Sequence, residues 1–178
     1  MIDLRFPSLP RSIECDGHLY RLDTSFRTWL SFGRELEEGR VWAGVFADEV
    51  PDGDWLPAAL EFFRSENACP HDVPEADARA IDLIGDGDLL VAAFQQAYGI
   101  DLTQGDMHWH RFKALVAGLP ESTKLSKVMG YRTYRKPPKS ETNDDLMRRM
   151  RRMWEIPDPD VQSSRDELLE WAETALPW

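Results

Sequence analysis

The alternation of apolar and polar positions is clearest between Asp88 and Leu119, where it predicts two amphipathic helices joined by a turn. Gly99 follows the first run, and glycine readily takes the left-handed conformation that closes a helix. Gly118 ends the second run in the same way. Polar residues are scattered around an apolar stripe in both helices, which is typical of packing or binding elements and not of a reactive site. The apolar positions are Leu89, Leu90, Ala93, Phe94 and Ala97 in the first helix, and Met107, Phe112, Leu115, Val116 and Leu119 in the second.

The N-terminal region predicts a β-hairpin followed by two helices. Residues 11–15 and 19–22 alternate in polarity on either side of Asp16-Gly17, a dipeptide that favours tight turns. One helix then begins at a cap formed by Asp23, Thr24 or Ser25 and ends at Glu38-Gly39. Asp54 is positioned to cap another helix that carries Leu56, Leu60, Phe62 and Phe63.

The remaining elements are also predicted to be helical. They are a short helix over Glu75–Ile84, one opened by Thr123 with Leu125, Val128 and Met129 inward, a basic helix from Ser140 to Trp154, and one opened by the capping box at Ser164. Proline pairs near residues 137 and 157 separate the last elements. We therefore expect a mainly α (α+β) fold, with an N-terminal hairpin and helical core domain over residues 1–136. Residues 137–178 are expected to form a mobile C-terminal helical arm.

Composition predicts one folded globule in a reducing compartment. The chain has 178 residues, 42% hydrophobic residues and seven tryptophans, enough to bury a core without disulfides or metal. Cys15 and Cys69 form no Cys-x-x-Cys pair, so free thiols are expected. No apolar run is long enough to span a bilayer, and the N-terminus lacks the apolar core of a signal peptide. A soluble protein of the cytoplasm, with no membrane partner, is the expectation.

Charge is distributed in three blocks. The net charge of −11 opposes general affinity for nucleic acid, since a binding surface must neutralise phosphates. Residues 1–110 carry a net −13, residues 111–155 a net +7 and residues 156–178 a net −5. Such blocks can pair between subunits of a homo-oligomer, pair within one chain, or present a basic stripe to an acidic partner. The sequence leaves these three interpretations open.

No pattern of catalytic, metal-binding or cofactor-binding residues stands out. His108 and His110 are the only clustered pair of metal-ligand candidates, and on a helix two such residues point about 200° apart. Short acidic residues around Gly85 and Gly87 are ordinary helix caps. Phosphate-loop, dinucleotide and nucleophile-elbow motifs are missing from the chain. We expect no enzymatic activity, no metal and no cofactor.

The basic segment between Arg132 and Arg152 supports two binding hypotheses. Its arginines and lysines interleave with Tyr131 and Tyr134, as in single-strand nucleic-acid-binding surfaces. Against this stand the overall acidity and a methionine stripe on the neighbouring face, which suits a protein groove. Simple core packing of that stripe is the leading interpretation. The stripe consists of Met147, Met150 and Met153.

Three segments of the chain resemble the bacteriophage gene-product-fifteen family of small tail proteins. They are AFQQAYGIDL (residues 93–102), MHWHRFKALVAGLPESTKLSKVMGYRTY (107–134) and LMRRMRRMWEIPD (146–158). Members are encoded beside the tape-measure gene and are regarded as tail assembly chaperones. In the family a second aromatic tends to follow the Trp109 position, where this chain has His110.

The resemblance implies a helical, non-enzymatic protein that binds the tape-measure polypeptide until tail-tube subunits polymerise around it. The tube protein is a further expected partner, and the chaperone itself is expected to be absent from the mature virion. The alternatives are a nucleic-acid-binding accessory protein and a structural tail subunit. The residues expected to bind the partner are Trp109, Phe112, Met147, Met150, Met153 and Arg149.

Overall fold

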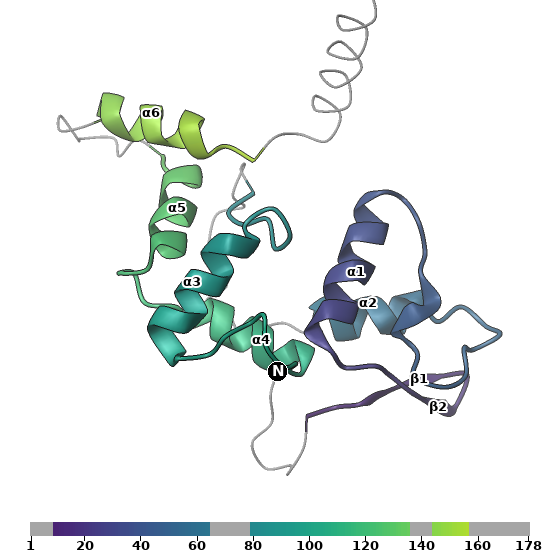
Figure 1. Ribbon diagram of the computed structural model, residues 1–178. Helices are drawn as coiled ribbons and strands as arrows, with labels where there is room; N and C mark the ends of the chain where they lie inside the picture. Colours follow the sequence, from purple (N-terminus) through teal and green to yellow (C-terminus); the bar gives the residue numbers. More distant parts are fainter. Residues whose placement is uncertain (1–8, 65–78, 136–143, 157–178) are drawn as a thin grey trace, which may run out of the picture. The chain divides into compact units, whose positions relative to one another are not determined.

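The computed structural model describes residues 9–64, 79–135 and 144–156 (Figure 1). Within these ranges the chain forms six α-helices, one short 3₁₀ helix and a two-stranded antiparallel hairpin, so the predicted mainly α fold with an N-terminal hairpin is confirmed. The described residues fall into two compact units: 9–64 with 83–126, and 79–82 with 127–135 and 144–156. Helix α5 begins in the first unit and ends in the second. No helix in the described part is long and apolar enough to cross a membrane.

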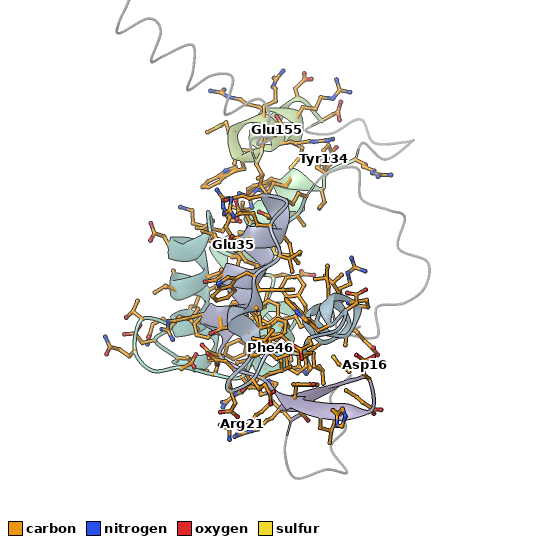
Figure 2. The ribbon with its side chains drawn as sticks, turned by 90° about the vertical axis from the view of Figure 1, so that its right-hand side faces the viewer. Asp16, Arg21, Glu35, Phe46, Tyr134 and Glu155 are labelled. Atoms are coloured by element: carbon orange, nitrogen blue, oxygen red, sulfur yellow. The ribbon has the colours of Figure 1, made fainter. Side chains whose placement is uncertain are left out.

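The hairpin has the turn that its sequence predicts. Strands β1 (Ser12–Cys15) and β2 (His18–Arg21) pair with Ser12 opposite Arg21. Asp16 and Gly17 both have positive φ values, 52° and 75°, as a type I′ turn requires. Ile13 and Cys15 point inward and are buried, while Ser12 and Glu14 face out. The hairpin therefore contributes one apolar face to the first unit, with Asp16 at its turn (Figure 2).

Helix α1 (Phe26–Glu37) begins at Ser25, whose Oγ accepts a hydrogen bond from the Arg27 N–H at 3.2 Å. Ser25 is thus the cap among the three predicted candidates. The apolar face of α1 buries Phe26, Trp29 and Phe32. The 3₁₀ helix η1 (Ala43–Val45) packs against this helix.

Three further helices complete the core of the first unit: α2 (Leu56–Arg64), α3 (Gly87–Tyr98) and α4 (Trp109–Ala117). Gly99 ends α3 at a φ of 65°, and Gly118 follows the last residue of α4, as predicted. The core is built largely from aromatic rings in mutual contact, which bury much apolar area with few side-chain torsions. The contacting rings are Phe26, Trp29, Phe32, Phe62, Phe63, Phe94, Trp109 and Phe112.

The predicted short helix over Glu75–Ile84 is wrong for its described part. Residues 79–82 have no regular structure and residues 83–86 form a turn, closed by a hydrogen bond from the Gly87 N–H to the Ile84 carbonyl. The Ala80 carbonyl accepts from the Arg132 guanidinium at 3.3 Å. A side-chain donor distant in the sequence thus satisfies a backbone acceptor here without a helix. Residues 75–78 lie outside the described part.

The second unit contains the end of α5 (Lys124–Arg132) and α6 (Asp144–Trp154). Thr123 opens α5 as predicted, since its Oγ1 accepts from the Ser126 N–H at 3.2 Å. The basic helix was expected to begin at Ser140, but residues 140–143 lie outside the described part, as does the helix expected after Ser164. The two units divide the chain after Ser126, and the arm over residues 137–178 stays a prediction.

Candidate peptide-binding groove

The first unit carries an open groove between the hairpin and α2. Its volume is about 1020 Å³. Ile13 and Phe62 are buried beneath it, and Leu56 and Leu60 are half-buried along its side. Strand β1 packs on α2, which fixes this floor. The complete lining is Pro10, Ile13, Glu14, Asp54, Leu56, Pro57, Ala58, Leu60, Glu61, Phe62, Arg64 and His110.

Carboxylates dominate the rim of this groove. Glu14, Asp54 and Glu61 are exposed and form no ion pair with any residue in the ranges 9–64, 79–135 and 144–156. Burial raises the pKa of the neighbouring Cys15 thiol, and the charges of Asp16, Asp54 and Glu14 raise that pKa further. The rim is therefore a negative region beside an apolar floor, a combination that favours a ligand with an apolar stripe and positive charges.

Helix α4 fixes α2 by binding its C-terminal carbonyl groups, which have no partner inside the helix. The Trp109 indole N–H donates to the Phe63 carbonyl at 2.9 Å, and His110 Nε2 contacts the Phe62 carbonyl at 2.9 Å. Lys113 Nζ donates to the carbonyls of Phe63 at 2.6 Å and Arg64 at 2.9 Å. Burial lowers the pKa of Lys113 to about 8. These contacts hold the helix that forms one side of the groove.

Both histidines of the predicted pair are engaged by backbone groups. His108 precedes α4 as its N-cap, so the pair does not lie on one helix and the rings approach to 5.1 Å between centroids. Its Nδ1 accepts from the His110 N–H at 3.1 Å, and its Nε2 contacts the Pro10 carbonyl at 2.8 Å. Burial lowers the pKa of both imidazoles, that of His110 to about 4. The described residues contain no group of three metal-ligand side chains.

The structure places the residues expected to bind a partner in three different settings. Trp109 and Phe112 are each 1% exposed and belong to the aromatic core of the first unit. Met147 and Met150 are half-buried in the second unit. Met153 is 65% exposed and Arg149 is also exposed. The six residues therefore do not form one surface, and only the last two are directly available to a partner.

The basic segment is divided as well. Arg132 is buried; its Nε donates to the Trp154 carbonyl at 2.6 Å, so its guanidinium stabilises the end of α6. Arg151 donates to the Tyr134 carbonyl at 3.3 Å. Figure 2 labels Tyr134 and Glu155, which follow α5 and α6 in this unit. Among the described residues of this segment, the exposed basic side chains are those of Arg148, Arg149 and Arg152 on α6 and Arg135 after α5.

The groove itself was not predicted from the sequence. The spacing of Leu56 and Leu60 indicates a helix face, and the alternation around Ile13 indicates a strand face, but neither pattern shows that the two faces adjoin. Of the three rim carboxylates, Asp54 and Glu61 are seven residues apart, but Glu14 lies forty residues before Asp54. No local signal gathers them.

Residues 59–156, more than half of the chain, match the family model described as Bacteriophage Gp15 protein. The resemblance found in the sequence is thereby confirmed: the chain belongs to the bacteriophage Gp15 protein family. The matched region begins within α2 and extends past α6, so it includes part of the groove and leaves out the hairpin. No match was found among curated proteins or among solved structures.

Proposed function

We propose that this bacteriophage protein is a non-enzymatic tail assembly chaperone that binds the tape-measure polypeptide in the groove between β1 and α2. The observation that carries the proposal is an open groove whose floor is apolar and whose rim carries three unpaired carboxylates. Membership of a bacteriophage family supports the setting. The protein acts in the host cytoplasm before the tail is complete and is not retained in the virion.

The groove suits an amphipathic helical client. The apolar stripe of such a helix lies against Leu56, Leu60 and Phe62, and basic residues beside the stripe face Glu61 and Asp54. Each contact is small, but a long client offers many similar segments, so several copies bind along one polypeptide. Each bound copy carries a net charge of −11, so clients coated with these copies repel one another and do not aggregate.

The test is co-expression with the tape-measure protein encoded beside this chain. We expect the chaperone to raise the soluble fraction of the client and to co-purify with it. Leu60→Asp introduces a charge on the apolar side of the groove, and Glu61→Lys reverses a charge on the rim, so both should reduce co-purification at least tenfold. Val41→Asp is the matched control, because Val41 is 57% exposed and lies outside the groove.

Each variant is first checked for folding by circular dichroism. Client recovery that is the same with and without the chain would contradict the chaperone role. If the chain raises client recovery and the Glu61→Lys variant raises it equally, the groove is not the binding site. Trp109 and Phe112 are not suitable test positions, because their replacement disrupts the core.

A nucleic-acid-binding accessory role is the second candidate, and the exposed arginines Arg148, Arg149 and Arg152 on α6 favour it. It predicts a gel shift with DNA or RNA that weakens steeply between 50 and 200 mM salt, on the order of tenfold or more for a few phosphate contacts.

A structural tail subunit is distinguished from a chaperone by mass spectrometry of purified particles, because the particles contain a structural subunit and lack a chaperone.

A further inference from the structure

Helix α6 has two faces that differ in what they contact. Its inner face carries half-buried Met147, Met150 and Trp154. Its outer face, defined here as Leu146, Arg149, Arg152 and Met153, is exposed, with Leu146 at 53% and Met153 at 65%. Arg149 and Arg152 form no ion pair with any residue that the structure describes. Two large apolar side chains and two unpaired cations thus share one surface.

This outer face complements the groove in charge and length. The groove offers an apolar floor beside Glu14, Asp54 and Glu61, and it runs along α2, whose nine residues span about 14 Å. The eleven residues of α6 span about 17 Å. Unpaired carboxylates on one surface and unpaired guanidinium groups on the other favour association between them.

The charges also favour one orientation. Along α2 the negative Asp54 precedes the helix and the positive Arg64 ends it. Along α6 the order is the same, with Asp144 and Asp145 in the first turn and the arginines later. When the two helices run antiparallel, Arg152 lies near Asp54 and Asp145 lies near Arg64, whereas the parallel arrangement brings Asp145 toward Asp54. Antiparallel helix dipoles add to this preference.

Helix α6 is held to its own unit at both ends. The Tyr134 hydroxyl lies 3.3 Å from the Asp144 carboxylate, and the Trp154 carbonyl accepts from Arg132 at 2.6 Å. The outer face is therefore presented by a folded unit and not by a free peptide. Each copy carries one groove and one outer face, so a dimer in which each copy offers its outer face to the other's groove pairs both surfaces.

We propose that the outer face of α6 docks antiparallel in the β1–α2 groove of a second copy of this chain, forming a homodimer. The inference rests on the proposed function only in taking the groove as a binding site, and its test contains no client. The experiment is sedimentation of the full chain at 1 to 100 µM, compared with two double variants. One is Arg149→Glu with Arg152→Glu, and the other is Asp54→Arg with Glu61→Arg.

We expect the wild-type chain to dimerise and each double variant to weaken dimerisation at least tenfold. Mixing the two variants should restore the dimer, because the reversed outer face of one then meets the reversed groove of the other, and the two unchanged surfaces also meet. Lys124→Glu with Lys127→Glu is the matched control, since it makes the same change in charge on the exposed side of α5.

A wild-type chain that stays monomeric over this range would overturn the proposal, as docking within one chain would give that result. A dimer that neither variant weakens, or a mixture that fails to restore it, would also overturn the assignment of the two surfaces. Failure of the chaperone test alone leaves this outcome unaffected, because no tape-measure protein is present.

Discussion

At the scale of single residues, α4 shows how polar side chains are used in this protein. Trp109, His110 and Lys113 are buried or half-buried, and each binds a C-terminal carbonyl of α2. In the sequence alone Trp109 suggested a partner surface and His110 belonged to a histidine pair, whereas Lys113 carried no prediction. Their polar atoms instead satisfy backbone acceptors that burial would otherwise leave without a partner.

His110 makes the fold sensitive to acid. Its pKa is lowered to about 4 by burial, whereas an unfolded histidine titrates near 6.5. As the pH falls through this interval the unfolded chain binds a proton that the folded chain excludes, so the free energy of unfolding decreases. The decrease in the free energy of unfolding that comes from His110 is at most about 3 kcal/mol, and it is reached near pH 4.

Urea unfolding at pH 7, 6, 5 and 4 measures this dependence. His110→Gln removes the titrating group while keeping a side-chain donor, so we expect a flatter dependence above pH 4.5. Below that pH, protonation of Glu35 and Glu38, whose pKa values Arg40 lowers, adds a separate loss in every variant. His18→Gln, at an exposed position, is the control. Equal slopes for wild type and His110→Gln would show that His110 does not couple to folding.

At the scale of elements, the sequence predicted what local chemistry determines. Asp16-Gly17, Ser25 and Gly99 act within a few residues of themselves, so the hairpin, the start of α1 and the end of α3 were predicted correctly. The prediction of a helix over residues 79–84 was wrong. There the Ala80 carbonyl accepts a hydrogen bond from Arg132, which lies far along the chain, and no local signal indicates that contact.

Because sequence patterns report local structure only, they also failed to locate the candidate site. Hydrophobic periodicity identified the apolar face of α4, but it does not tell a core from a partner surface, and Trp109 and Phe112 lie in the core. The groove depends on β1 packing against α2, more than forty residues away. The rim carboxylates belong to the acidic block of residues 1–110, but the net charge of that block does not indicate which of its carboxylates lie close together in the fold.

Arg132 connects α5 to α6, and its replacement should loosen the second unit. In Arg132→Met the Trp154 carbonyl loses a charge-assisted donor and the end of α6 loses a cation that its dipole favours. We expect a destabilisation of about 2 kcal/mol, with faster amide exchange in α6 than in α1. Lys127→Met, an exposed change on α5, should have little effect. Unchanged exchange in α6 would show that the Arg132 contact does not stabilise the helix.

At the scale of the whole molecule, the acidic groove and the basic helix α6 belong to different units. The groove with its unpaired carboxylates belongs to the first unit, and α6 with its unpaired arginines belongs to the second. If a second copy and a client use the same groove, self-association and client binding compete. Part of the binding-competent chain is then occupied in the dimer, which lowers the apparent affinity for the client.

This competition predicts that disabling the outer face improves client binding. Arg149→Glu with Arg152→Glu leaves the groove intact while weakening its occupation by α6, so at micromolar concentration more tape-measure protein should co-purify per copy of the chain than with wild type. The control is again Lys124→Glu with Lys127→Glu, which should match wild type. The measurement is quantitative co-purification at several concentrations of the chain. The advantage of the variant over wild type should shrink on dilution, because the wild-type dimer dissociates at low concentration and frees its grooves. Weaker recovery with the α6 variant at every concentration would mean that the outer face contacts the client itself, and the groove would then not be the shared site.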